Sequence, residues 1–262
     1  MTRFIVIGLG NMGRQVGKLL KKCSPHNNIV GVEKNLPKGE TNLPFTVVDS
    51  ISKIKLTPTD CSILCIKPQD LHNFSNEIYS GNSIVKDPGS LISVLAGVST
   101  DTLGHFLPHT KLCRAMPNLA MNKGKSDTAF YTTDSSLAQM TKTIFSHGGS
   151  PIKVNNETDI DVATAIIGSG PAFILKLCKG MNAEASLQNV PTHLASQFIA
   201  ASLKAAASME DLSTITQITS KGGTTEAGIN ILNRYGFDNI IKSTIRTCIA
   251  KSHELDHKTR NS

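Results

Sequence analysis

The stretch FIVIGLGNMG at residues 4–13 decides how the rest of the chain is interpreted. Its four apolar residues, 4–7, are typical of a fully buried parallel strand, and Val16, Leu19 and Leu20 follow at helical spacing. Glycines spaced as G-x-G-x-x-G between a strand and a helix form the dinucleotide-binding fingerprint, which brings the backbone close to a pyrophosphate. The sequence therefore predicts a Rossmann domain whose dinucleotide contacts Gly8, Gly10, Asn11, Met12 and Gly13.

The second predicted strand, residues 28–33, bears on the choice of cofactor. It ends in Glu33, where the fingerprint expects an acid that binds the ribose hydroxyls of the adenosine. A carboxylate there repels a 2′-phosphate and so favours NADH over NADPH. Lys34, which we also expect to contact the cofactor, and Lys38 follow closely and offset part of that repulsion. The sequence therefore slightly favours NADH and leaves NADPH open.

Three more apolar stretches, residues 60–66, 91–98 and 111–116, are expected as further strands of a doubly wound sheet. Ligands of such sheets bind at the carboxyl ends of the strands. A single lysine or asparagine after a strand is usually a solvated loop residue, but recurrence at equivalent places indicates a cofactor site. The contacts expected there are Lys67, Pro68, Ala96, Gly97 and Asn118. The sheet is completed by two short strands around a helix, at residues 128–132, 151–154 and 136–145.

After about residue 155 the strand-like runs stop and the chain reads as helices. We expect a Rossmann domain over residues 1–155 and an all-α domain for substrate binding and dimerisation over residues 156–262. Helix 192–209 is apolar around much of its circumference and needs cover on several sides, which predicts a homodimer with twofold symmetry. Residues after 257 are expected to fray. The expected helices are residues 159–167, 172–185, 192–209, 212–218, 225–234 and 239–255.

Composition narrows the class of protein. The chain has 262 residues, a net charge of +7 and scattered basic residues, which suits anionic cofactors and substrates better than nucleic acid. The six cysteines form no CxxC pair and no metal-ligand spacing with histidine, so we expect free thiols, a reducing compartment and no metal. The apolar stretch 162–178 contains GSGP at 168–171 and Lys176, so we expect a buried helix pair and not a membrane span. These features predict a cytoplasmic protein.

A second glycine loop, TSKGGTTEAGI at residues 219–229, lies far from the first in the sequence. It reads as a helix start with Thr224 or Thr225 as the N-cap and Glu226 in the first turn. The two glycines before it leave backbone N–H groups bare, which suits a carboxylate or phosphate. From this stretch alone, an ordinary capped helix after a turn is equally consistent. The dinucleotide loop near the start of the chain favours the small-anion site.

Six motifs together resemble the pyrroline-5-carboxylate reductases over nearly the whole chain. They are GLGNMG at residues 8–13, IKPQ at 66–69, SVLAGV at 93–98, RAMPN at 114–118, GSGPA at 168–172 and SKGGTT at 220–225. The resemblance implies a helical domain that interlocks with its twin, and hydride transfer from NADH or NADPH to the imine carbon of 1-pyrroline-5-carboxylate, giving L-proline. It also implies that Thr225 is the catalytic residue, hydrogen-bonding the ring nitrogen. The residues implied to hold the substrate carboxylate are Ser220, Lys221, Gly222, Gly223 and Thr224.

The chain departs from the family pattern at four places. Ile167 replaces a serine, Lys221 a proline and Leu119-Ala120 a Thr-Pro pair, and Asp211 stands where a proline is common. Lys221 removes a rigid φ from the substrate loop but adds a cation near the carboxylate. These departures keep two alternatives open: a reductase of another imine or keto acid, and a weakly catalytic dinucleotide-binding protein.

Overall fold

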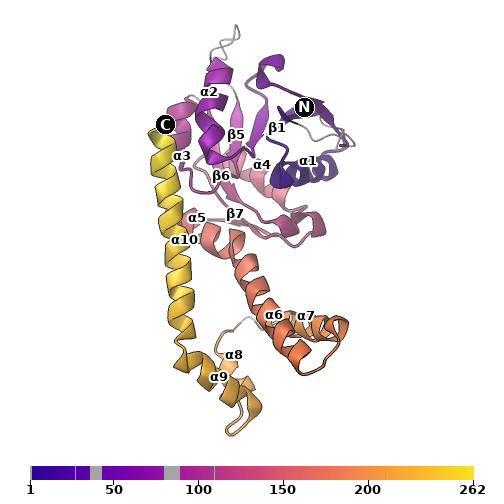
Figure 1. Cartoon of the computed structure of the whole chain (residues 1–262). Helices are drawn as coiled ribbons and strands as arrows, with labels where there is room; N and C mark the ends of the chain where they lie inside the picture. The colour runs from indigo at the N-terminus through magenta and orange to yellow at the C-terminus, as the bar shows by residue number, and fades with distance from the viewer. Residues whose placement is uncertain (1, 27, 36–42, 80–88, 109, 210) are drawn as a thin grey trace. The chain divides into compact units, whose positions relative to one another are not determined.

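The computed structural model describes residues 2–26, 28–35, 43–79, 89–108, 110–209 and 211–262, so Lys38 lies outside the described residues. The chain divides into two compact units (Figure 1). The first combines Met1–Gly168 with Cys248–Ser262, and the second is Ser169–Thr247. The division of roles predicted between residues 1–155 and 156–262 stays a prediction.

An eight-stranded sheet forms the centre of the first unit. The strands lie in the order β3-β2-β1-β4-β5-β6-β7-β8, and all neighbours are parallel except β6 and β7. The chain runs outward from β1 on one side and returns on the other with β4, so the strand order reverses between these two. The strands are β1 Phe4–Ile7, β2 Ile29–Val32, β3 Thr46–Val48, β4 Cys61–Leu64, β5 Ser90–Ser93, β6 Lys111–Met116, β7 Thr128–Tyr131 and β8 Pro151–Lys153.

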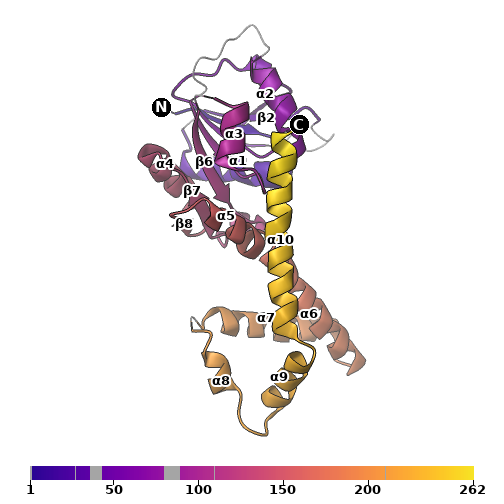
Figure 2. The ribbon, with the colours of Figure 1, turned by 90° about the vertical axis from the view of Figure 1, so that its left-hand side faces the viewer.

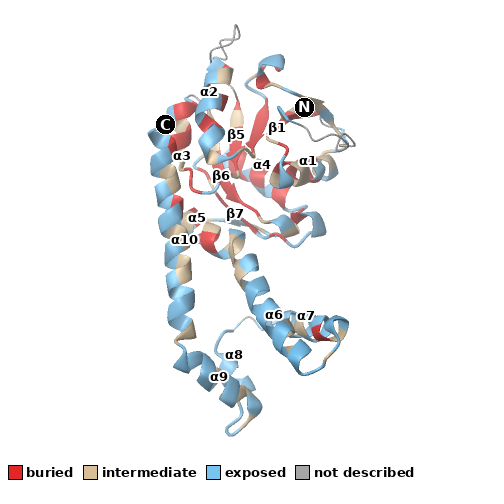
Figure 3. Ribbon diagram, viewed as in Figure 1, coloured by how far each residue is buried: buried red, intermediate tan, exposed pale blue. Residues whose placement is uncertain are grey.

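Helices cover both faces of this sheet and create two hydrophobic cores. In β1, Phe4 and Val6 point to the face covered by α1 (Asn11–Cys23) and α4 (Ser135–Phe145). Ile5 and Ile7 point to the opposite face, under α2 (Leu71–Tyr79) and α3 (Thr100–Phe106). Alternate residues of a strand face opposite sides, so a strand covered on both sides must be apolar throughout. The predicted Rossmann sheet with a helical C-terminal region is confirmed, and Figure 3 shows the buried residues gathered around it.

Several elements differ from the sequence prediction. The strand expected at residues 91–98 ends at Ser93. Strand β3, helices α2 and α3 and the short 3-10 helices η1 (Ile51–Lys53), η2 (Pro68–Asp70) and η3 (Leu119–Lys123) were not predicted. Each is short, and except in α2 too few apolar residues repeat for periodicity to separate the element from a loop. Helix α5 (Thr158–Ala163) passes into a π-helical turn, η4 (Thr164–Gly168).

The second unit consists of helices with little buried surface. They are α6 (Gly170–Leu187), α7 (Thr192–Ala207), α8 (Thr214–Ile218), α9 (Thr224–Arg234) and the first part of α10 (Phe237–Arg260). Among its described residues only Ala195 is buried, so the expectation of a buried helix pair at residues 162–178 is wrong for α6 in the single chain. By length and composition, the helical run Thr158–Leu187 could cross a membrane, with 17% of its most apolar 18-residue window buried.

Helix α10 begins in the second unit and ends in the first. The fraying expected after residue 257 is wrong, because α10 stays helical to Arg260. Thr259 is buried, and the Arg260 guanidinium pairs with Asp101 of α3. The end of α10 lies beside α3 in both Figure 1 and Figure 2. Tertiary contacts therefore hold a helix end that local sequence signals place in a mobile tail.

Candidate functional site

A cleft of about 530 Å³ opens at the carboxyl ends of β1, β2 and β4, where the strand order reverses. This is the place where open α/β sheets bind their ligands. Five of the predicted cofactor residues line it together: Gly8, Gly10, Glu33, Lys34 and Lys67. The rest of its wall comes mainly from α2 and the loop before it, including Asp70, Asn73, Phe74 and Glu77.

The glycine loop has the shape that a bound pyrophosphate needs. Gly8 has a φ of +87°, and a methyl group added at Gly13 would lie 1.8 Å from the Gly8 carbonyl oxygen, so α1 packs directly against the loop. A methyl group at Gly10 would meet nothing within 4 Å, which leaves open space above the loop. Gly10 is the N-cap of α1 and no side chain caps this helix. The N-terminus of α1 is thus uncapped, and the residues present fit a dinucleotide. Contact of the first-turn residues Asn11 and Met12 with a cofactor stays a prediction, since neither lines the cleft.

Glu33 follows β2, and its carboxylate is held against the glycine loop. Its Oε2 accepts a hydrogen bond from the Leu9 N–H at 2.7 Å, and its Oε1 accepts one from the Asn35 N–H at 3.2 Å. These two bonds fix a negative charge beside the loop in the cleft. A carboxylate in this position can accept hydrogen bonds from ribose hydroxyls and opposes a phosphate there.

Lys34 is paired with an acid that the sequence analysis did not single out. Its Nζ lies 2.9 Å from Oε2 of Glu77 on α2. The other oxygen of Glu77 accepts a hydrogen bond from the Ser50 hydroxyl. Burial raises the pKa of Glu77, but the hydrogen bonds from Ser50 and Lys34 outweigh it and leave the pKa below its ordinary value. No local signal could identify Glu77, because its helix was not predicted and its partner lies 43 positions earlier in the chain.

Lys67 and Pro68 lie between β4 and α2. Lys67 has an extended backbone and precedes the short helix η2, in which Pro68 occupies the first turn. Proline suits this position because it has no N–H to leave unpaired and its φ is already helical. Lys67 lines the cleft in which a dinucleotide would lie.

Ala96 and Gly97 follow β5 but do not line the cleft. Gly97 is buried with a φ of +65°, and a methyl group there would lie 2.6 Å from the Ser252 carbonyl oxygen of α10. Close approach to α10 therefore explains this glycine in structural terms, while Ala96 beside it is exposed. Contact of either residue with a cofactor stays a prediction.

Asn118 follows β6 and organises the turn after it. Its Oδ1 accepts a hydrogen bond from the Ala120 N–H at 2.9 Å, which caps η3. Its side-chain amide donates to the Ile167 carbonyl at 3.3 Å. Ile167, one of the departures from the family pattern, thus keeps a backbone contact that does not depend on its side chain. Cofactor contact by Asn118 also stays a prediction.

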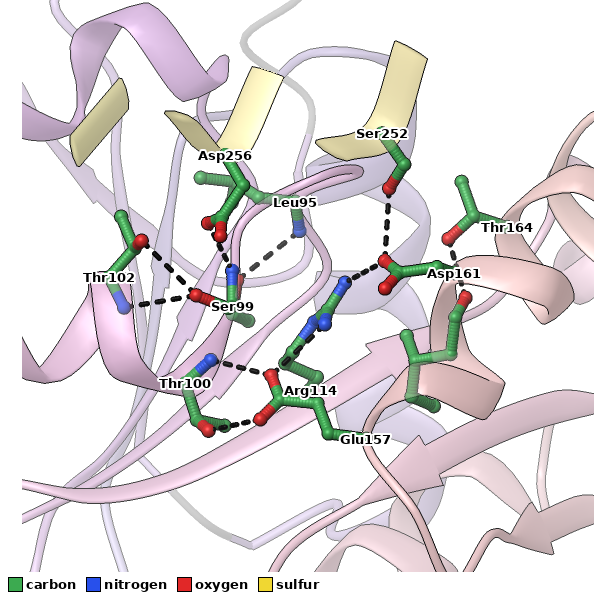
Figure 4. A network of polar contacts seen from close by, with 12 residues as sticks. Leu95, Ser99, Thr100, Thr102, Arg114, Glu157, Asp161, Thr164, Ser252 and Asp256 are labelled. Atoms are coloured by element: carbon green, nitrogen blue, oxygen red, sulfur yellow. Dashed lines mark hydrogen bonds and ion pairs between the residues drawn. The ribbon is translucent and has the colours of Figure 1, made fainter. Parts of the chain in front are cut away.

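A buried ionic network was missed by the sequence analysis (Figure 4). Arg114 on β6 is 2% exposed, and its guanidinium pairs with Glu157 at 3.0 Å and with Asp161 at 2.9 Å. Glu157 also accepts a hydrogen bond from the Thr100 N–H at 2.6 Å, and Asp161 accepts one from the Ser252 hydroxyl at 3.0 Å. A buried charge needs such compensation, so these bonds connect β6, α3, α5 and α10 into one assembly.

The second glycine loop lies in the second unit at the start of α9. Gly223 is the N-cap of this helix and no side chain caps it, so the expectation that Thr224 or Thr225 is the cap is wrong. Both threonines lie in the first turn, and Glu226 reaches back to accept a hydrogen bond from the Gly222 N–H at 2.7 Å. The Gly223 N–H also donates, to the Ser220 carbonyl oxygen at 3.0 Å, so the expectation that the two glycines leave bare N–H groups is wrong. An anion here would have to meet the N–H groups of the first turn of α9 instead.

The predicted substrate residues share this loop. Ser220 is adjacent to Gly223, because a methyl group on Gly223 would lie 2.4 Å from the Ser220 Oγ. Gly222 has a φ of +74°, and Lys221 is exposed beside it. Within the described part of the chain, no group of three or more His, Cys, Asp or Glu side chains is placed to hold a metal ion.

Comparison with known proteins extends the likeness over both units. The family model for pyrroline-5-carboxylate reductase dimerisation matches residues 157–255. Pyrroline-5-carboxylate reductase 2 of Bacillus subtilis is 31% identical over 209 residues, which cover 76% of this chain and 73% of that protein. The structure of 1-pyrroline-5-carboxylate reductase from Streptococcus pyogenes has a TM-score of 0.84 at 25% identity, covering 97% of this chain and 98% of that one.

A fourth likeness concerns the fold. Pyrroline carboxylate reductase of Plasmodium falciparum, solved with NADP bound, has a TM-score of 0.82 at 18% identity and covers 97% of each chain. The relative, the family model and the two solved structures all carry the same family description. The chain belongs to the pyrroline-5-carboxylate reductase family.

Proposed function

We propose that this protein reduces 1-pyrroline-5-carboxylate to L-proline with a nicotinamide dinucleotide as the hydride donor. One observation carries the proposal: a chain of this family has an intact glycine-loop cleft at the point where its strand order reverses. Family membership supports the substrate, and the cleft supports the cofactor.

The chain's own residues have simple tasks in this reaction. The bound cofactor supplies the hydride. The glycine loop and the start of α1 bind the pyrophosphate, and Glu33 orients the ribose beside Leu9. In the second unit, the open N-terminus of α9 binds the substrate carboxylate and the Thr225 hydroxyl hydrogen-bonds the ring nitrogen. A protonated imine is already electrophilic, so positioning supplies much of the acceleration and no strong general acid is needed.

We also propose that NADH is preferred over NADPH. The support is the Glu33 carboxylate, which two backbone N–H groups hold at the ribose end of the cleft. A 2′-phosphate brought there would meet a fixed like charge, whereas two ribose hydroxyls would meet an acceptor.

The working protein is proposed to be a twofold-symmetric homodimer in the cytoplasm, without a membrane or nucleic-acid partner. The family's dimerisation region covers residues 157–255 and therefore all of the second unit. The exposed apolar side chains of α6 and α7 provide the surface, including Ile174, Leu175 and Phe198. A second copy covering them accounts for the apolar run Thr158–Leu187 without a lipid bilayer.

The first test is oxidation of NADH and NADPH by the purified protein, followed by nicotinamide absorbance with and without racemic 1-pyrroline-5-carboxylate. We expect substrate-dependent turnover that is faster with NADH. Thr225→Ala should lower kcat by about 100-fold if the hydroxyl acts on the reacting nitrogen, while NADH binding persists. If the unchanged protein binds NADH but oxidises neither cofactor when the substrate is present, the result would contradict the proposal. It would favour a weakly catalytic dinucleotide-binding protein.

A further inference from the structure

Glu77 is not among the expected cofactor residues, but it forms an ion pair with one of them, Lys34. Its carboxylate lies in the wall of the cleft and bonds Lys34 through one oxygen and the Ser50 hydroxyl through the other. The Ser50 hydroxyl is itself fixed, because it accepts a hydrogen bond from the Ser52 N–H at 3.1 Å as the cap of η1. Glu77 is therefore held by the body of the first unit, and Lys34 is held by Glu77.

Exposure shows which partner of this pair is the mobile one. The Glu77 side chain is 20% exposed and the Lys34 side chain 63% exposed. A long, exposed lysine chain can reach several positions, whereas a half-buried carboxylate with a second anchor stays in place. The position of the Lys34 ammonium is thus set by Glu77, and a change at Glu77 redirects it.

The position of the Lys34 ammonium is important because several other charged side chains line the same cleft. The charged residues that line the cleft are Glu33, Lys34, Lys67, Asp70 and Glu77. Lys34 directly follows Glu33, whose carboxylate is fixed on the glycine loop. Lys34 is therefore the lysine of this set that lies next to the acid expected at the ribose. Its ammonium is paired with Glu77, which already neutralises part of its charge.

We propose that Glu77 is a cofactor-specificity residue, which binds the Lys34 ammonium away from the adenosine ribose and so keeps the cleft selective for NADH. This inference rests on the proposed function, since it concerns the dinucleotide of the same cleft. Glu33 excludes the 2′-phosphate directly, and Glu77 excludes it by removing the cation that would otherwise compensate.

The test is a set of four proteins: unchanged, Glu77→Gln, Lys34→Met and the double variant. Dissociation constants for NADH and NADPH, which differ only in the 2′-phosphate, are measured from nicotinamide fluorescence without substrate. Glu77→Gln should bind NADPH about fivefold tighter, as expected if the freed Lys34 ammonium pairs with the solvent-exposed 2′-phosphate. It should bind NADH within about twofold of the unchanged protein. Lys34→Met alone should change NADPH binding less than about twofold, and in the double variant it should abolish the gain.

Two controls separate this mechanism from a general charge effect. Asp70→Asn removes a negative charge from the same cleft wall but leaves Lys34 on Glu77, so it should not reproduce the fivefold gain. Ser50→Ala removes an anchor of Glu77 while keeping its charge, and should give a smaller gain than Glu77→Gln. Equal gains from Asp70→Asn and Glu77→Gln would overturn the proposal.

NADPH affinity of the single variant Lys34→Met is an independent measurement, because it can be interpreted even if Glu77→Gln does not fold. A loss of NADPH affinity above about threefold there would mean that Lys34 already meets the 2′-phosphate, and would overturn the role of Glu77. A folded Glu77→Gln protein that binds NADH and keeps the original preference for NADH over NADPH would also overturn the role of Glu77. That result would leave the proposed function standing. Failure of the unchanged protein to bind either cofactor would instead reject the proposed function itself.

Discussion

The two units are both rich in apolar residues but use them in opposite ways. Helix α1 of the first unit buries Val16, Leu19 and Leu20 against the sheet. Helix α6 of the second unit has no buried residue, and its Ile174 and Leu175 are 50% and 65% exposed. The comparison shows that the first unit completes its core within one chain, whereas the second has an apolar surface whose cover must come from outside that unit.

The largest expected effect comes from breaking the ionic network of the first unit. Replacing Arg114 with Met removes the buried guanidinium from the partly buried carboxylates of Glu157 and Asp161. We expect a loss of about 3 kcal/mol in the free energy of unfolding, measured by urea denaturation at fixed protein concentration.

Lys111→Met is the matched control for this variant. Lys111 lies on the same strand, but its ion pair with Asp134 is exposed, so its loss should cost at most about 1 kcal/mol. Similar losses from the two variants would show that burial of the Arg114 network adds nothing to the stability of the first unit.

The second unit is tested through its surface. Phe198 on α7 is 57% exposed in the single chain, and Phe198→Glu would place a charge in the proposed interface. We expect the dimer dissociation constant to rise by at least about 30-fold, corresponding to about 2 kcal/mol, in sedimentation measurements. Ile152→Glu, which changes an exposed apolar residue of the first unit, should leave self-association unaltered. Equal effects of the two variants would place the interface elsewhere.

The smallest expected effect comes from a substitution at Gly97, where the end of α10 packs within the first unit. Gly97→Ala puts a methyl group 2.6 Å from the Ser252 carbonyl oxygen at a φ of +65°, and should lower the free energy of unfolding by about 1–2 kcal/mol. Gly104→Ala in α3 meets only a Leu112 methyl at 3.7 Å and should stabilise the helix by about 0.5 kcal/mol. Thermal denaturation of both variants gives the comparison, and opposite signs are the expected result.

The sequence predicts what depends on neighbouring residues. The glycine loop and β1 follow from one stretch, and β6 was predicted with the bounds it has, Lys111–Met116. Helix α2 was missed although Leu71, Phe74 and Ile78 stand at helical spacing, because the helix is only nine residues long. The partners of Arg114 and Lys34 were missed because they lie 43 to 47 positions away, and charge alone does not say which acid a base will meet. Similarly, no local signal shows that α10 persists to Arg260.

The return of residues 248–262 to the first unit also sets the order in which the protein can be completed during synthesis. The Ser99 N–H donates a hydrogen bond to Asp256 of α10, and Asp161 accepts one from the Ser252 hydroxyl of the same helix. Domains usually fold from the N-terminus as the ribosome releases them. Here the sheet emerges first, but the hydrogen bonds from Ser99 to Asp256 and from Ser252 to Asp161 form only after the whole helical unit has been translated. A nascent chain therefore completes its first unit only after its second unit has been translated.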